Sequence, residues 1–241
     1  KVLITGGLGF QGANLAVALA SREHQVSVFN TPSVQAQENE RRIRAHSQVH
    51  VVYGSVRDSS VVRQCVTGQD VVVHMAAIAS PDACRIYPSD AVHVNVLGTQ
   101  VVLAAVKAVG VQKVIHVSSC EVYGDGLHID HQCEDHTLLN PPHVYGASKA
   151  AADRLAYAYI KEFSLPIVIV RPCNVFGPWQ RWGPEGAVIP TMTKRALHGL
   201  SIQVRGGNQS REFVYIADLV SWYVFLIENQ IHEDILNLGT G

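Results

Sequence analysis

The sequence predicts an α/β fold, in which a doubly wound parallel sheet carries helices on both faces and a smaller lobe follows. Three observations predict it: short apolar runs alternate with helical patterns, Gly-rich turns join them, and 47% of the 241 residues are hydrophobic. A chain of this size can bury one large core. We expect a single domain over residues 1–241, with the sheet in about 1–171 and the smaller lobe in about 172–241. Its first and last residues suggest an excerpt that lacks a C-terminal end.

The first strand is predicted over Lys1 to Thr5, and a helical pattern that includes Leu15 follows. The turn between them carries Gly6, Gly9 and Gly12, at the spacing GxxGxxG. Glycines at this spacing allow a tight turn and let the backbone approach a pyrophosphate that rests on the N-terminus of the helix. We therefore predict a dinucleotide cofactor that is held by Gly6, Gly9, Phe10, Gln11 and Gly12.

The second strand is predicted over His24 to Asn30 and ends where an acidic residue normally binds the adenosine ribose. Asn30 can still hydrogen-bond a ribose, and it does not repel a 2′-phosphate. Three arginines follow in a polar segment, either near that phosphate or on a solvated helix face: Arg41, Arg42 and Arg44. We expect NAD as the cofactor, and NADP stays possible.

Apolar runs with turn signals between them predict further elements of the sheet. The strands are expected over Val49–Tyr53, Asp70–Met75, Val111–Ser118 and Ser164–Arg171, and the helices over Asp58–Val66 and Ser89–Val109. Ala76 and Ala77 follow the fourth strand and are small enough to let the backbone approach a cofactor. The helix over Ser89–Val109 is apolar nearly all round, so a second face must be buried, and a homodimer contact is the simplest account.

Tyr145 and Lys149 lie four residues apart in a helical pattern, so they share one face. A nearby cation favours the ionised form of a phenol, whose pKa is ordinarily about 10, and we expect Lys149 to lower the pKa of Tyr145. Ser119 follows an apolar strand and can hydrogen-bond the same substrate oxygen, and Glu121 adds a carboxylate. Alone, such a pair is an ordinary helix-surface pair. The predicted dinucleotide site makes it a candidate acid–base group.

Composition excludes other classes of protein. The 19 Lys and Arg residues nearly balance the 20 Asp and Glu residues, which argues against a nucleic-acid or membrane-surface partner. The five cysteines are scattered without CxxC spacing, so a reducing, cytoplasmic location is expected. No apolar run approaches the length of a membrane span.

Seven motifs together resemble the extended short-chain dehydrogenase/reductases, namely the NAD-dependent epimerase/dehydratase family that modifies nucleotide sugars. They cover essentially the whole chain: Thr5–Gly12, His74–Ala77, Asn95–Thr99, Ser118–Gly124, Tyr145–Lys149, Arg171–Pro178 and Arg211–Asp218. The resemblance implies a Rossmann fold and a nucleotide-sugar substrate. It also implies that Ser55, Val56 and Asn95 bind the cofactor.

By this resemblance, Tyr145 takes the proton of the sugar C4 hydroxyl, Lys149 holds the nicotinamide ribose, and Ser119 hydrogen-bonds the same oxygen. Asn174 would contact the substrate near its diphosphate, and Arg211 would pair with that diphosphate. A carbonyl reductase with free cofactor fits less well because the Arg211 segment indicates a diphosphate substrate. A non-catalytic NADP sensor is disfavoured because Tyr145 and Lys149 are present.

Glu121 stands where 4,6-dehydratases and uronate decarboxylases carry a glutamate, so the resemblance favours a 4,6-dehydratase. The alternatives are a 4-epimerase and, less favoured, a UDP-glucuronate decarboxylase. Cys120 stands where many 4,6-dehydratases have an aspartic acid, and its thiol either donates a proton or fills space.

The segment before Tyr145 contains His128, His131, Cys133 and His136, which resembles metal-ligand spacing. The family needs no metal, so we predict a lid over the sugar and no metal site. Beyond it, a covering loop is expected over Gly177–Pro190, helices over Val188–Leu200 and Ile216–Glu228, and a short strand over Ser201–Arg205.

Overall fold

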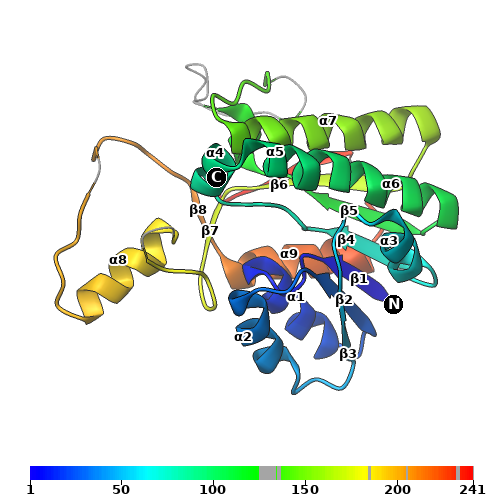
Figure 1. Cartoon of the computed structure of the whole chain (residues 1–241), viewed down its shortest axis with the longest axis horizontal. Coiled ribbons are helices and arrows are strands. Elements are labelled where there is room, and N and C mark those ends of the chain that lie inside the picture. Colours follow the sequence, from blue (N-terminus) through cyan, green and yellow to red (C-terminus); the bar gives the residue numbers. More distant parts are fainter. Residues whose placement is uncertain (125–133, 135–136, 184–185, 205, 232–233, 241) are drawn as a thin grey trace.

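A computed structural model describes residues 1–124, 134, 137–183, 186–204, 206–231 and 234–240 (Figure 1). The described residues form one seven-stranded sheet in which every neighbouring pair is parallel. The strand order is β3 (Val49–Tyr53), β2 (Val26–Asn30), β1 (Val2–Thr5), β4 (Val71–His74), β5 (Lys113–Val117), β6 (Ile167–Pro172) and β9 (Ile235–Leu238). The order reverses direction at β1, which confirms the predicted doubly wound sheet.

Helices cover both faces of this sheet (Figure 1). One face carries α1 (Phe10–Ala20), α2 (Val34–Ile43) and α9 (Ile216–Glu228). The other face carries α3 (Ser59–Val66), α6 (Gly98–Val109) and α7 (Val144–Phe163), with the short α4 (Pro81–Ile86) and α5 (Pro88–Ala91) beside α7. The strands are therefore buried on both faces, which explains why they read as continuous apolar runs.

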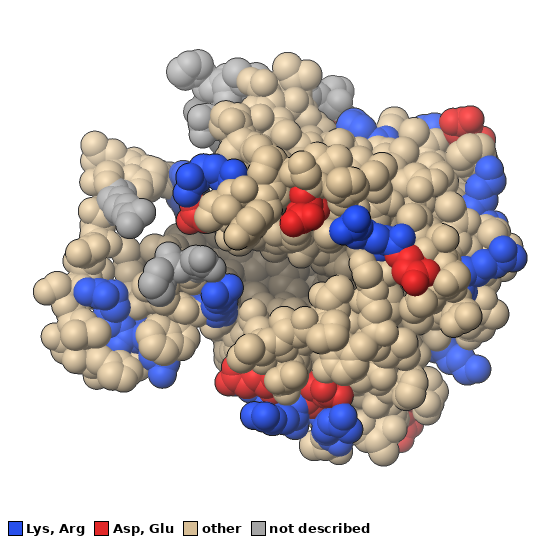
Figure 2. Space-filling view, viewed as in Figure 1, with Lys and Arg blue, Asp and Glu red and all other residues tan. Residues whose placement is uncertain are grey.

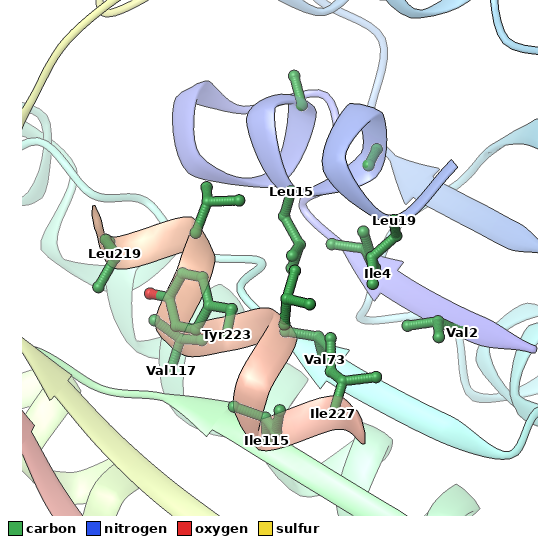
Figure 3. Packing of buried hydrophobic residues seen from close by; sticks show 14 of the residues in the cluster. Val2, Ile4, Leu15, Leu19, Val73, Ile115, Val117, Leu219, Tyr223 and Ile227 are labelled. Atoms are coloured by element: carbon green, nitrogen blue, oxygen red, sulfur yellow. The ribbon is translucent and has the colours of Figure 1, made fainter. Parts of the chain in front are cut away.

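The core divides according to the alternation of side chains along each strand. Val2 and Ile4 of β1 pack with Leu15 of α1 and Tyr223 of α9 (Figure 3). Leu3, between them, points to the opposite face and joins the cluster under α3 and α6. Burial of each such aliphatic side chain contributes about 1.5–3 kcal/mol, so both clusters stabilise the fold.

The helix predicted over Ser89–Val109 is continuous from Pro88 and contains a π-helical segment, η1 (Val92–Leu97), between α5 and α6. By length and composition, Pro88–Val109 is also apolar enough to cross a membrane. The expectation that no apolar run approaches such a length was therefore wrong. In the fold, this helix packs against α3 and α7.

The predicted strand over Ser201–Arg205 was wrong. Residues 201–204 are irregular and exposed, and Arg205 lies outside the described residues. Alternating apolar side chains do not make a strand where no neighbouring backbone is available for pairing. A second sheet instead joins β7 (Asn174–Phe176) to β8 (Phe213–Tyr215), and α8 (Val188–Leu197) stands apart from the main body (Figure 1).

Candidate active site

A cleft of about 660 Å³ opens at the carboxyl ends of the parallel strands, and Figure 2 shows the hollow in this face. Most residues predicted to bind the cofactor line it: Gly6, Gly9, Phe10, Gln11, Gly12, Asn30, Ser55, Val56, Ala76, Ala77, Tyr145 and Lys149. They come from elements far apart in the sequence, which meet because the carboxyl ends of parallel strands share one edge.

The turn between β1 and α1 fits a dinucleotide. Gly6 has a φ of +71°, and a Cβ there would lie 2.8 Å from the backbone of Ala76. Only glycine is therefore compatible with this approach of β1 to the end of β4. Gly9 is the N-cap of α1 and provides no side-chain cap, so the first amide groups of the helix are available to a pyrophosphate.

Asn30 supports the same turn. Its Oδ1 accepts a hydrogen bond from the Leu8 amide at 3.2 Å, and its Nδ2 donates to the Thr31 carbonyl at 2.7 Å. Of the nearby arginines, Arg42 donates to Glu38, and Arg44 donates to Glu40. These pairs are typical of a solvated helix face, so they do not single out a 2′-phosphate site.

Asn95 lies behind the wall of the cleft rather than in its lining. The buried amide donates to the Ile78 carbonyl at 3.2 Å and to Ser148 Oγ at 2.9 Å, and its oxygen accepts from the Ile78 amide at 2.7 Å. Ile78 itself lines the cleft. Asn95 therefore supports the wall of the cleft, and its predicted contact with the cofactor stays a prediction.

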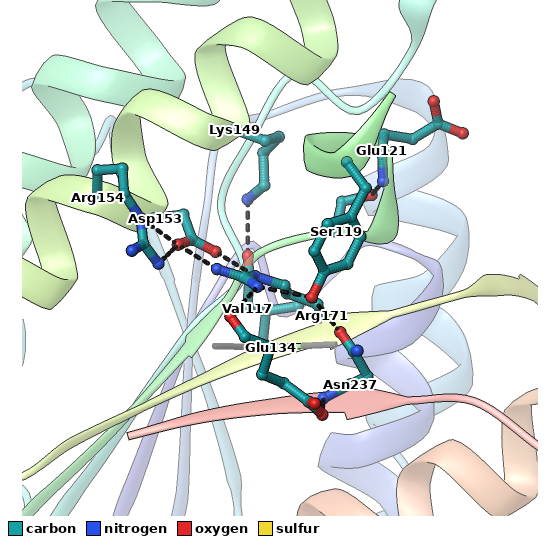
Figure 4. Close-up of polar contacts among 10 residues, drawn as sticks. Val117, Ser119, Glu121, Glu134, Lys149, Asp153, Arg154, Arg171 and Asn237 are labelled. Atoms are coloured by element: carbon teal, nitrogen blue, oxygen red, sulfur yellow. Dashed lines mark hydrogen bonds and ion pairs between the residues drawn. The ribbon is translucent and has the colours of Figure 1, made fainter. Parts of the chain in front are cut away.

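Tyr145 and Ser119 converge as predicted, because their side chains share a hydrogen bond. The expected lowering of the pKa of Tyr145 by Lys149 was wrong. Burial raises the pKa of Tyr145 to about 12, and the hydrogen bond with Ser119 offsets this only in part. The Lys149 ammonium is engaged elsewhere, since it donates to the Val117 carbonyl at 2.6 Å (Figure 4).

Lys149 is a buried cation at the base of the cleft. Burial lowers the pKa of Lys149 to about 8, although the nearby charge of Asp153 acts in the opposite direction. The hydrogen bond to Val117 fixes the side chain beside the end of β5. Because Lys149 also lines the cleft and an ammonium has three N–H donors, it can still hydrogen-bond a ribose or a phenolate there.

Glu121 belongs to the short 3₁₀ helix η2 (Cys120–Tyr123), which begins at Ser119. The Ser119 hydroxyl accepts a hydrogen bond from the Glu121 amide at 3.2 Å, and this contact sets the start of η2. The Glu121 carboxylate contacts His143 at 2.9 Å and is near enough to Tyr145 to contribute to the rise in its pKa, which burial dominates. Cys120 hydrogen-bonds Cys173, whose thiol also contacts Glu212.

Asn174, predicted to bind substrate, begins β7, and Arg211, also predicted to bind substrate, lies two residues before β8. Asn174 is in register with Phe213, and its Nδ2 donates to the Glu212 carbonyl at 3.1 Å. Arg211 is exposed and donates to the Ser210 carbonyl at 2.7 Å. Neither residue lines the cleft described above.

Sequence reasoning missed three residues of this region: His143, Asp153 and Arg171. His143 stands at the N-cap position of α7, and a histidine directly before a helical pattern is a readable signal. Arg171 is the charged residue of an otherwise apolar strand, which indicates a buried partner. The histidines of the predicted lid, with Cys133, lie outside the described residues. No cluster of metal-binding side chains occurs in the part of the chain that the structure describes.

The sequence profile of the NAD-dependent epimerase/dehydratase family matches residues 2–239. The chain belongs to this family. The family predicted from the motifs is thus confirmed, together with NAD as the cofactor on which the family depends.

Relatives with different reactions resemble this member of the family. A dTDP-D-glucose 4,6-dehydratase of Dictyostelium discoideum is 30% identical over 255 residues, and the match covers 100% of this chain but 58% of the relative. A solved structure of a UDP-N-acetylglucosamine 4-epimerase from Methanobrevibacter ruminantium has a TM-score of 0.91 at 28% identity. DesIV, a dTDP-glucose 4,6-dehydratase from Streptomyces venezuelae solved with NAD bound, has a TM-score of 0.89 at 30% identity. The match covers 100% of this chain and 76% of each structure.

Proposed function

We propose that this protein is a nucleotide-sugar 4,6-dehydratase that acts through transient oxidation at the sugar C4. The observation that supports it most is the position of Glu121, a carboxylate that lies near Tyr145 and two residues after Ser119 in sequence. An acid–base phenol and a second base at one site can act on neighbouring carbons of one sugar. The substrate class is a nucleoside diphosphate sugar.

Tyr145, Ser119 and Glu121 have different roles in the proposed reaction. Tyr145 removes the proton of the C4 hydroxyl, and Ser119 hydrogen-bonds the same oxygen. Gly6–Gly12 would hold NAD, which would supply an acceptor for the hydride from C4 and afterwards a hydride donor to the eliminated sugar. The resulting C4 ketone acidifies the hydrogen on C5, and Glu121 removes it as a proton. The C6 hydroxyl then leaves, and with one proton it forms water.

Lys149 and Arg211 serve binding in this proposal. Lys149 holds the nicotinamide ribose from the base of the cleft, where its hydrogen bond to the Val117 carbonyl already fixes it. Arg211 pairs with the diphosphate, and Asn174 contacts the substrate nearby, since Asn174 is in register with Phe213, two residues after Arg211. A guanidinium suits this task because it can bind two phosphate oxygens at once.

Mass spectrometry of the protein with UDP-, dTDP-, GDP- and CDP-sugars tests the proposal. A product lighter by one water, absent with Tyr145→Phe, is the expected result. A product lighter by carbon dioxide from a uronic acid would instead indicate a decarboxylase.

The second candidate function is a nucleotide-sugar 4-epimerase, which the similarity to the solved UDP-N-acetylglucosamine 4-epimerase supports. Such an enzyme needs Tyr145, Lys149 and Ser119 but no base at C5. A product of unchanged mass with inverted C4 would replace the dehydratase with this function. Glu121 would then be a binding residue.

We further propose a cytoplasmic homodimer that has no nucleic-acid or membrane partner. The apolar side chains of Val92 and Leu97 are 47% and 49% exposed on the helical run from Pro88 to Val109, where a second copy would cover them. Four cysteines are free in the described residues, as in a reducing compartment. Sedimentation of the wild type and of Leu97→Glu tests the dimer, which the charged variant should dissociate.

A further inference from the structure

The Glu121 carboxylate lies beside the imidazole of His143, a residue with no role in the chemistry above. His143 Nε2 and Glu121 Oε2 are 2.9 Å apart. About a third of each side chain is exposed, 37% for His143 and 34% for Glu121, so both can face a substrate. The contact joins η2 to the N-terminus of α7. Figure 4 shows the Glu121 carboxylate directed away from the buried cluster around Arg171.

The backbone determines which ring nitrogen of His143 carries hydrogen. His143 is the N-cap of α7, and its Nδ1 lies 3.0 Å from the Gly146 amide. An amide N–H can only donate, so Nδ1 must present its lone pair. A neutral ring then carries its hydrogen on Nε2 and donates it to Glu121. This hydrogen bond fixes the position of the Glu121 carboxylate through its Oε2 oxygen.

The glycine at position 146 permits this arrangement. A Cβ there would lie 2.6 Å from Pro141 Cβ, 2.7 Å from the Glu121 carbonyl oxygen and 3.0 Å from His143 Cε1. Only glycine therefore lets the first turn of α7 approach η2 this closely. The His143 ring also lies parallel to the Tyr145 ring, with 7° between the planes and 6.3 Å between the centroids. One imidazole thus lies beside both acid–base groups.

We propose that His143 is a positioning residue, which holds Glu121 in place as the base that removes the C5 hydrogen of the 4-keto sugar. The inference rests on the proposed dehydratase function. Capping alone does not require a histidine, because serine or asparagine caps a helix equally well. The imidazole adds what those side chains are too short to add, namely a second nitrogen that reaches Glu121.

The step balances without a further reactant. The C5–H bond breaks, its proton passes to Glu121, and its electron pair is delocalised into the C4 ketone as an enolate. The enolate then expels the C6 hydroxyl, which leaves as water with the proton that Glu121 removed from C5. His143 keeps its Nε2 hydrogen throughout and exchanges no electrons.

The kinetic test separates His143 from the steps that precede it. His143→Ser keeps a cap acceptor for α7 and removes the contact with Glu121. We expect deuterium exchange at C5 in heavy water, and loss of water, to slow about 10- to 100-fold. Oxidation at C4, followed by nicotinamide absorbance in the first turnover, and KM should change less than about twofold, because Tyr145 is untouched.

Further variants test whether the effect of His143 depends on its contact with Glu121. His143→Gln, whose amide N–H can reach Glu121, should recover part of the lost rate. Glu121→Gln combined with His143→Ser should be no slower than Glu121→Gln alone, because His143 acts through Glu121. The control is His24→Ser, which removes a histidine that lies 3.1 Å from Glu228 on the surface, and it should leave every rate unchanged. Equal C5 exchange in His143→Ser and wild type overturns the inference.

Nitrogen NMR of the imidazole in the resting protein gives a readout that is independent of turnover. The inference requires a hydrogen on Nε2 of His143 and none on Nδ1, and a ring protonated on Nδ1 overturns it.

Measurements on the wild-type protein show whether the proposed dehydratase function itself fails. A wild type that oxidises C4 but neither exchanges C5 nor loses water removes the dehydratase and this role of His143 together. A wild type that does both, with an unaffected variant, removes the role of His143 alone.

Discussion

Arg171 and Asp153 form a bidentate ion pair beneath the candidate active site, with Arg171 Nε and Nη2 each 2.9 Å from a carboxylate oxygen (Figure 4). The Arg171 side chain is 1% exposed and that of Asp153 is 0% exposed. Arg171 also donates to the Tyr123 hydroxyl at 2.6 Å, and Tyr123 donates to Asn237 at 2.7 Å. The pair therefore ties α7, β6, η2 and β9 together one helical turn below Lys149.

Asp153→Asn should destabilise the protein strongly, because it leaves the Arg171 charge buried without a compensating carboxylate. Breaking a buried pair in this way costs about 3–5 kcal/mol. Urea unfolding at pH 7 measures the change. Asp153→Leu combined with Arg171→Met removes both charges and should recover more than half of the loss. A cost below about 1 kcal/mol for Asp153→Asn, as for an exposed pair, would contradict the buried geometry.

The sheet was predictable because its strands are buried on both faces, so apolar runs such as Val111–Ser118 identify them without knowledge of their neighbours. The Gly-rich turn and the Tyr145–Lys149 pair were predictable because each depends on residues close in sequence. The strand predicted over Ser201–Arg205 was wrong because a strand forms only where a second strand pairs with it. No local pattern reveals whether that partner exists.

The contacts that sequence reasoning missed join residues far apart in the chain. Glu121 and His143 are 22 residues apart, and Asp153 and Arg171 are 18 residues apart. The direction of the pKa shift of Tyr145 also could not be predicted from the sequence. The spacing brings Lys149 to the same helix face, but only the fold shows that the Val117 carbonyl holds the ammonium.

The stability of the protein should fall in mild acid through His116. Both ring nitrogens are buried and, among the described residues, have no hydrogen-bond partner. His74, Lys149 and Asp153 face this ring. Burial lowers the pKa of His116 to about 3, the Lys149 charge adds to this, and Asp153 opposes it.

An unfolded histidine binds its proton near pH 6.5, so between pH 6.5 and about 3 the unfolded state holds more protons, and stability falls as pH falls. The expected loss from His116 alone is about 1.5 kcal/mol between pH 6.5 and pH 5. His116→Leu should remove that part of the slope in urea unfolding curves, while the contribution of buried His74 stays. Parallel slopes for the variant and wild type would rule out this account.

Lys149 should give the same direction of change, but at alkaline pH. Burial lowers the pKa of Lys149 to about 8, against 10.5 for an ordinary lysine. Between these values the unfolded chain keeps the proton that the folded chain has lost, so stability rises with pH. The expected gain is about 1.5 kcal/mol between pH 8 and pH 9.5. Lys149→Met should lack this gain when both proteins are unfolded in urea across that range.

Cys120 should prove to be a packing residue rather than the acid that protonates the leaving C6 hydroxyl. Its hydrogen bond with Cys173, together with burial, raises the pKa of Cys173, and Glu212 contacts the same thiol. A thiol engaged in this way is poorly placed to deliver a proton to substrate. Cys120→Ala should therefore lower the rate of water loss less than about threefold, whereas removal of a general acid costs about 100-fold or more. Mass spectrometry of the product over time distinguishes the two, with Cys120→Ser as the variant that keeps a small donor. A fall of about 100-fold in Cys120→Ala, rescued by serine, would make Cys120 the acid.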